Sequence, residues 1–112
     1  MRRIAIAATI LTALTAPGWA VELTVINKSD YVIKELYVAP SKSKKWGPEQ
    51  LREHSIGKDQ SFTLRNIPAG VYDLKVVDED DDSCVASNIT FGDKDKEWTL
   101  TNAIIEQCEG DD

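Results

Sequence analysis

The chain has 112 residues, and its 13 basic and 19 acidic side chains give a formal charge of −6 at pH 7. A chain this acidic repels phosphate backbones, which makes nucleic acid a poor partner and favours metal cations or a basic protein surface. One histidine and two cysteines are too few for a zinc centre, and the sequence holds no glycine-rich phosphate loop.

Residues 1–20 have the composition of a secretory signal peptide. Arg2 and Arg3 precede an apolar run that ends at Ala16, and Pro17-Gly18-Trp19-Ala20 follows, with the small residue Ala20 at the expected cleavage point. The run is shorter than the roughly 20 residues that span a bilayer. We therefore predict cleavage after Ala20, export to the periplasm or the medium, and a single soluble domain of residues 21–112 with no membrane attachment.

The mature chain alternates apolar and polar residues with a period of two, which predicts strands separated by turns. The expected strands are residues 23–26, 31–39, 60–65, 71–77, 83–91 and 97–101, with a short closing strand at Ile104 and Ile105. Strands that recur about every ten residues are typical of a sandwich or small barrel. We predict an all-β fold, a small antiparallel β-sandwich of six or seven strands in which the first two strands pair.

Cys84 and Cys108 are the only cysteines of the chain. In an oxidising compartment such a minimal set most simply forms one intramolecular bridge. The predicted disulfide ties the C-terminal segment to the strand that contains Cys84, and closing this loop is worth about 3 kcal/mol. A redox or catalytic pair is disfavoured because the C-x-x-C spacing is missing.

An acidic run fills residues 78–82, where the strand pattern predicts a hairpin turn. Its alternating residues Asp78, Asp80 and Asp82 resemble the opening of a calcium loop, and carboxylate oxygens are the ligands that calcium prefers. Positions 83 and 89 lack the glycine and glutamate of an EF-hand. The predicted calcium site is therefore a looser one, which neighbouring carboxylates from Asp93, Asp95 or Glu97 would strengthen. The competing interpretation is a solvated turn without a ligand.

Two charged segments are candidates for binding a partner protein. Lys44 and Lys45 adjoin Trp46, and a partly exposed tryptophan beside cations is a common interface anchor. The structural alternative is that Trp46 covers the open end of the sandwich. On the acidic hairpin, Glu79 and Asp81 supply charge complementary to a basic periplasmic or cell-envelope protein.

Enzyme interpretations have little support in the sequence. The single histidine, His54, has no partner at a spacing that indicates a catalytic triad, and acidic residues are too abundant to single out a carboxylate pair. We predict a non-enzymatic periplasmic binding module that holds calcium at the acidic hairpin. The alternative is a protein-interaction module, such as an inhibitor or immunity-type protein, and a hydrolase is the minor alternative.

Three segments carry a resemblance to known proteins: LYVAPS at residues 36–41, WGPEQL at 46–51 and YDLKVVDED at 72–80. Together they resemble a group of small exported bacterial β-sandwich proteins of unassigned function. The resemblance implies a compact periplasmic β fold with the tryptophan loop and the acidic hairpin as recurrent features, and it names no substrate. Such proteins usually carry glycine where this chain has Asp81.

Overall fold

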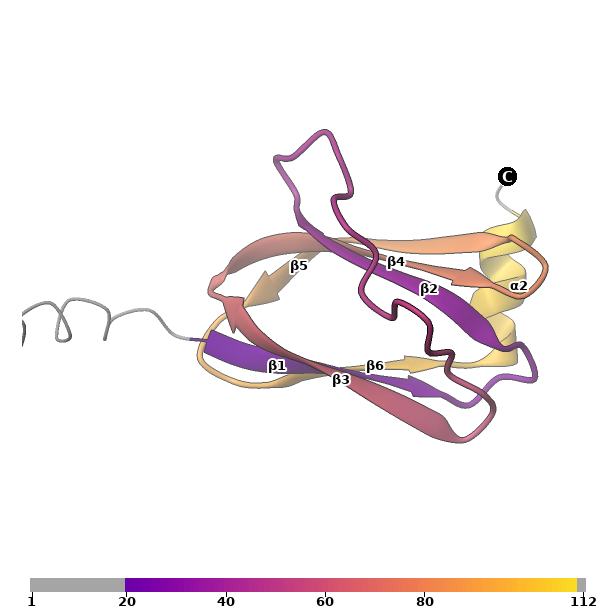
Figure 1. Cartoon of the computed structure of the whole chain (residues 1–112). Helices are drawn as coiled ribbons and strands as arrows, with labels where there is room; N and C mark the ends of the chain where they lie inside the picture. Colours follow the sequence, from indigo (N-terminus) through magenta and orange to yellow (C-terminus); the bar gives the residue numbers. More distant parts are fainter. Residues whose placement is uncertain (1–19, 111–112) are drawn as a thin grey trace, which may run out of the picture.

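The computed structural model describes residues 20–110 as a sandwich of two three-stranded sheets (Figure 1). One sheet has the order β3-β1-β6, formed by Gln60–Pro68, Ala20–Asn27 and Lys96–Leu100. The other has the order β2-β4-β5, formed by Ile33–Pro40, Gly70–Asp78 and Ser83–Phe91. The predicted all-β fold class is confirmed. The predicted leader lies outside the described residues, apart from Ala20, which begins β1.

Strand pairing differs from the expected antiparallel sandwich in two respects: β1 and β2 lie in different sheets, and one pair of strands is parallel. The first two strands do not pair: β1 is antiparallel to β3 and parallel to β6, whereas β2 is antiparallel to β4 in the other sheet. The chain crosses between the sheets at Asn27, whose buried amide donates to the carbonyl oxygens of Tyr31 at 2.7 Å and Ile56 at 2.8 Å. These bonds replace the tight turn that a β1–β2 hairpin requires.

The hydrophobic core lies between the two sheets and is built from the inward residues of the alternating strands. In β1, Val21, Leu23 and Val25 are buried while their neighbours are partly exposed. The irregular segment between β2 and β3 adds Leu51 and Ile56, which are at most 1 % exposed. Burying an aliphatic side chain of this kind contributes about 1.5–3 kcal/mol, so this segment is part of the core and not a detached loop.

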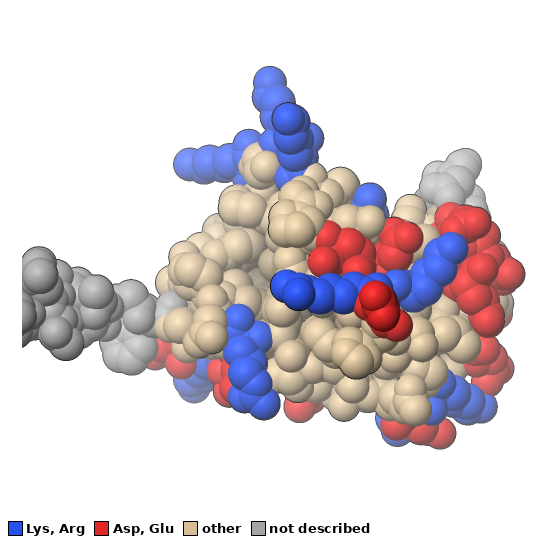
Figure 2. Space-filling model, in the orientation of Figure 1, with Lys and Arg blue, Asp and Glu red and all other residues tan. Residues whose placement is uncertain are grey.

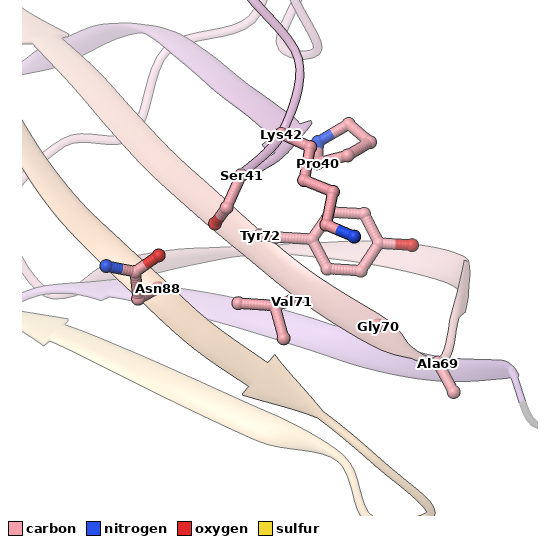
Figure 3. Close-up of a pocket in the computed structure, with 8 residues that line it drawn as sticks. All are labelled: Pro40, Ser41, Lys42, Ala69, Gly70, Val71, Tyr72 and Asn88. Carbon is pink, nitrogen blue, oxygen red and sulfur yellow. The ribbon is translucent and has the colours of Figure 1, made fainter.

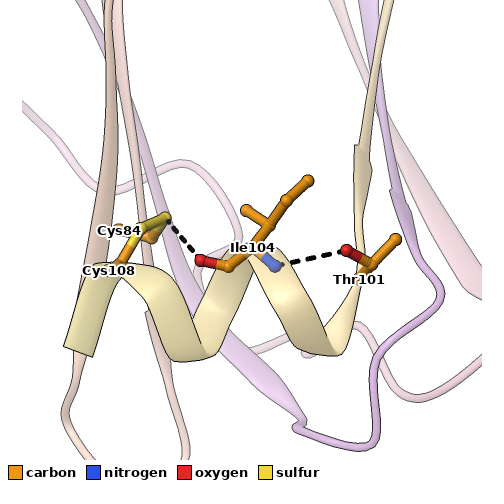
Figure 4. Close-up of a disulfide and its surroundings, with 4 residues drawn as sticks. All are labelled: Cys84, Thr101, Ile104 and Cys108. Atoms are coloured by element: carbon orange, nitrogen blue, oxygen red, sulfur yellow. Dashed lines mark hydrogen bonds between the residues drawn. A yellow bond between two sulfur atoms is a disulfide. The ribbon is translucent and has the colours of Figure 1, made fainter. Parts of the chain in front are cut away.

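A helix, α2 (Asn102–Gly110), stands where a closing strand at Ile104 and Ile105 was expected. Its start is stabilised by Thr101, whose Oγ1 accepts the N–H of Ile104 at 3.3 Å (Figure 4). The carbonyl oxygen of Thr101 accepts the N–H of Ile105 at 3.0 Å. The predicted strand is wrong because Ile105 and Cys108 repeat with helical spacing against β5. Among residues 20–110, no helix has the length and apolar character that crossing a lipid bilayer requires.

The disulfide joins Cys84 near the start of β5 to Cys108 in α2, with 5.2 Å between the Cα atoms (Figure 4). This confirms the predicted bridge. It fastens the helix to the end of the β2-β4-β5 sheet at which the acidic hairpin lies, because Cys84 follows that hairpin directly in the chain.

Removing the hydroxyl of Thr101 is expected to destabilise the fold through the start of α2. The Thr101→Ala variant loses the acceptor for the N–H of Ile104, and the loss of such a capping bond costs about 1 kcal/mol. Urea unfolding followed by circular dichroism measures the change. The matched variant Thr101→Ser keeps the hydroxyl and should retain most of the parent stability. Equal stability of parent and Thr101→Ala would show that this bond does not hold the helix.

Candidate cation site at the β4–β5 hairpin

The acidic hairpin, defined as residues 78–82, is a tight turn closed by the backbone. The N–H of Asp78 donates to the carbonyl oxygen of Asp82 at 2.9 Å, and the N–H of Asp81 donates to that of Asp78 at 2.9 Å. Asp81 has a φ of 66°, in the left-handed region where glycine is favoured and aspartate is tolerated. The chain therefore keeps a tight turn with an aspartate, and not a glycine, at position 81.

Asp78 is the buried member of the hairpin, with 1 % of its surface exposed. The alternation of β4 places it on the same inward face as Leu74 and Val76. Its Oδ1 accepts the N–H groups of Asp80 at 2.9 Å and Asp82 at 3.1 Å. Its Oδ2 is buried and has no hydrogen-bond partner among the described residues. Leaving a buried acceptor unpaired costs about 1–3 kcal/mol, so this oxygen is a candidate ligand for a cation.

The three alternating aspartates converge on one point. One carboxylate oxygen from each of Asp78, Asp80 and Asp82 lies within 4.8 Å of the others. Asp78 is buried, Asp82 is half-buried and Asp80 is exposed, so the group opens from the end of the sheet toward solvent. Three carboxylate oxygens with room for water suit a hard cation such as calcium, which takes six to eight oxygen ligands.

The more distant acids do not join this group. Asp95 accepts the N–H of Glu22 in β1 at 2.9 Å, and Asp93 follows the end of β5, at the opposite end of the sandwich from the hairpin. Glu97 lies in β6 of the other sheet. The candidate ligands at the hairpin are therefore its own carboxylates alone.

Glu79 and Asp81, the acidic residues expected to contact a partner, are engaged within the fold. Glu79 accepts the N–H of Val32 at 3.3 Å, and its own N–H donates to the Val32 carbonyl oxygen at 2.8 Å. Asp81 forms an ion pair with Lys34, and this hydrogen bond is the main cause that raises the pKa of Lys34. Both residues brace the hairpin against the chain around the start of β2.

The basic residues of the expected partner site lie at the other end of β4. The loop with Lys44 and Lys45 begins after Pro40, which is paired with Tyr72, whereas the hairpin begins at Asp78. Six strand residues separate the two places, about 20 Å. Figure 2 shows the cations projecting from this loop and the acidic side chains gathered at the α2 end. The two halves of the predicted partner site thus form separate surfaces.

Trp46 packs on the outer face of the β2-β4-β5 sheet and does not cover the open end of the sandwich. Its ring centroid is 6.3 Å from that of Tyr37, and the ammonium of Lys75 lies 4.9 Å from the Trp46 ring and 4.6 Å from the Tyr37 ring. The tryptophan is only partly exposed as a result. It is tied to its own sheet by aromatic and cation–π contacts.

A second polar cluster, centred on Asp73, has no counterpart in the sequence interpretation. Asp73 Oδ1 accepts the hydroxyl of Ser41 at 2.7 Å and the N–H of Asn88 at 2.9 Å. The bond from Asn88 is the main cause that lowers the pKa of Asp73, and the bond from Ser41 adds to it. The three residues come from three separate segments, so no local motif indicates the cluster.

Asp73 is expected to contribute to stability only at a pH where it is ionised. Because its pKa is lowered in the folded state, its contribution is complete above the unfolded value of about 4 and is lost as the pH falls through the folded pKa. The Asp73→Asn variant should therefore lose less stability than the parent between about pH 5 and pH 2. Urea unfolding across this range measures it, with exposed Asp93→Asn as the control. An unchanged acid slope in Asp73→Asn would contradict the assignment.

No protein-family model, curated protein or solved structure matches the chain. Among residues 20–110, the hairpin aspartates are the one group of three potential metal ligands whose ligand atoms converge.

Proposed function

We propose that the protein is a non-enzymatic binding module of an extracytoplasmic compartment, the periplasm, and that its acidic hairpin holds calcium through Asp78, Asp80 and Asp82. The observation that carries the proposal is the Oδ2 atom of Asp78, which is buried beside two other carboxylates without a hydrogen-bond partner among the described residues. The Cys84–Cys108 disulfide supports an extracytoplasmic location, because such bridges persist where the environment is oxidising.

The ligand chemistry favours calcium over other common metals. All three protein ligands are carboxylate oxygens, and no histidine or cysteine belongs to the group, so a zinc or copper ion would lack its preferred nitrogen or sulfur ligands. Magnesium demands near-ideal octahedral geometry and gives up its waters reluctantly, whereas calcium accepts irregular shells completed by water. A partly exposed site of this kind fits the affinity of extracellular calcium modules, with a Kd of about 10⁻⁴–10⁻³ M.

Cation binding at this place would act on the end of the β2-β4-β5 sheet. The hairpin joins β4 to β5, contacts the chain before β2 through Glu79, and lies next to the disulfide that holds α2. A bound ion would offset the mutual repulsion of the aspartates and fix these elements relative to one another. The expected role is therefore a calcium-dependent ordering of this end of the molecule.

Calorimetric titration with calcium tests the proposal. The parent protein should bind one ion per chain with saturation at millimolar calcium, at about the affinity given above. The double variant Asp80→Asn, Asp82→Asn removes two ligand charges from exposed and half-buried positions and should lose the signal. The control Asp93→Asn changes an exposed acid at the opposite end and should bind like the parent. Absence of heat and of any thermal shift in the parent would overturn the calcium site.

The second candidate is a protein-interaction module for a basic partner, which the acidic surface around the hairpin favours (Figure 2). Acidic surfaces of this kind accelerate encounters with basic proteins. Capture from a periplasmic extract, with and without charge reversal of the hairpin, discriminates the candidates. A calcium-inert parent whose capture of a basic protein is lost on charge reversal would replace the calcium proposal by this one.

A further inference from the structure

An open pocket lies at the start of β4, between the loop that follows β2 and the neighbouring strand β5. It encloses about 670 Å³, and Figure 3 shows the side chains that line it. This volume is within the range of about 300–1,000 Å³ that is typical of small-ligand sites. We propose that this pocket binds a carboxylated sugar unit of an acidic polysaccharide. The proposal is independent of the calcium site, which lies at the other end of β4.

The apolar wall of the pocket is rigid and suits the flat C–H face of a sugar ring. Tyr72 is held in place because its hydroxyl donates to the carbonyl oxygen of Pro68 at 2.7 Å and its ring packs edge-to-face on Phe91 at 5.2 Å. Val71 precedes Tyr72 in β4, points to the opposite face of the strand and exposes 45 % of its surface, and it also lines the pocket. The ring of Tyr72 therefore offers an apolar surface that a pyranose ring can cover.

Two polar side chains of the pocket are available to a ligand. Within the described part of the chain, the Lys42 ammonium forms no ion pair and the Asn88 side-chain amide forms no hydrogen bond. The hydroxyl of Ser41 and the N–H of Asn88 are both occupied by Asp73, which fixes the strand geometry beneath them. Lys42 therefore offers a cation for a carboxylate, and Asn88 offers a donor and an acceptor for sugar hydroxyls.

The charge of the loop favours an anionic ligand. Lys42, Lys44 and Lys45 lie within four residues, all are exposed, and none pairs with an acid among residues 20–110. The nearby carboxylate of Asp73 has one oxygen occupied by two hydrogen bonds. A carboxylated sugar uses the cation, the amide and the apolar wall together. Lysine binds phosphate as well as carboxylate, but a phosphate group alone would leave the apolar side of the pocket uncovered.

Binding of a six-unit oligogalacturonate, measured by calorimetry in EDTA and low salt, tests the proposal. EDTA removes calcium, which would otherwise bind both the hairpin and the oligosaccharide. The parent should show saturable binding that neutral maltohexaose does not reproduce. Lys42→Gln and Asn88→Asp should each weaken binding by about tenfold or more, because one removes the cation and the other adds a like charge. Lys94→Gln, an equal charge change outside the pocket lining, should bind like the parent.

Three results would overturn the proposal. These are no binding of oligogalacturonate at millimolar concentration, equal binding of polyphosphate, and an equal loss in the Lys94→Gln control, which would show diffuse charge attraction. Both pocket variants should retain the parent Tm and its response to calcium, since Lys42 is exposed and aspartate tolerates the left-handed φ of 58° found at position 88. A negative result for oligogalacturonate therefore does not affect the calcium proposal, and a negative result for calcium does not affect the pocket proposal.

Discussion

Replacing Asp78 with asparagine is expected to abolish stabilisation by calcium and to make the protein more stable without calcium. The asparagine oxygen can still accept the N–H groups of Asp80 and Asp82, so the turn keeps its hydrogen bonds. The new amide nitrogen replaces the unpartnered Oδ2 and can donate to a neighbouring carboxylate. In EDTA we expect a gain of about 1 kcal/mol, since a buried acceptor without a partner is removed.

In the presence of calcium, the parent should become more stable than Asp78→Asn. At about 10 mM calcium and a Kd near 10⁻³–10⁻⁴ M, the parent gains about 2 kcal/mol, or roughly 10 °C in Tm, and Asp78→Asn gains nothing. Thermal unfolding with and without calcium measures both the gain of Asp78→Asn in EDTA and the gain of the parent in calcium. Asp78→Ala, which loses the hydrogen bonds as well, should be less stable than the parent in both conditions. A parent insensitive to calcium, together with a destabilised Asp78→Asn, would show that Asp78 serves the turn alone.

The second large effect is expected from removal of the disulfide. The double variant Cys84→Ser, Cys108→Ser frees two segments separated by 24 residues in sequence. Closing a loop of this length is worth about 3 kcal/mol, which is a large part of the stability of a domain this small. We expect a fall of roughly 15 °C in Tm, measured by calorimetry under non-reducing conditions.

The loss should concentrate at the α2 end of the molecule. Within the described residues, α2 has its strand contacts mainly with β5, which the disulfide holds. Amide hydrogen exchange should therefore show faster exchange in α2 than in the β1–β3 pair, which the variant leaves paired. The parent treated with reductant should behave like the variant. Equal stability of oxidised and reduced parent would show that packing alone holds the helix.

The strands were predictable from the sequence because their pattern is local, whereas their pairing was not. Residues 23–26 are rich in β-branched side chains and are followed by a polar turn sequence, and this alone predicts β1. Its partners β3 and β6 lie tens of residues away, and nothing near β1 specifies them. The closing segment was misinterpreted because two adjacent isoleucines suit a strand, while the hydroxyl of Thr101 and the spacing to Cys108 favour a helix.

The sequence predicts which residues form the candidate site, but it does not predict that the Oδ2 atom of Asp78 is buried without a hydrogen-bond partner. The alternating aspartates identify the ligand set, and the turn brings their oxygens together as expected. Asp78 is buried because it continues the inward alternation of Leu74 and Val76 in β4. In the sequence this alternation is hard to recognise, because Asp78 is the first of five consecutive acidic residues, which together are typical of a solvent-exposed turn. The pocket at the start of β4 had no such signal, because Lys42, Tyr72 and Asn88 come together only through the pairing of three strands.

Amide NMR spectra recorded during a calcium titration test the central claim most directly, because they locate the ion as well as detect it. We predict saturable shifts centred on the backbone N–H groups of Asp80 and Asp82, which both donate to Asp78, with one ion bound per chain. Signals of the β5–β6 turn around Asp93 should stay in place. Small, unsaturable shifts spread evenly over acidic residues at both ends of the sandwich would contradict a cation site at the hairpin.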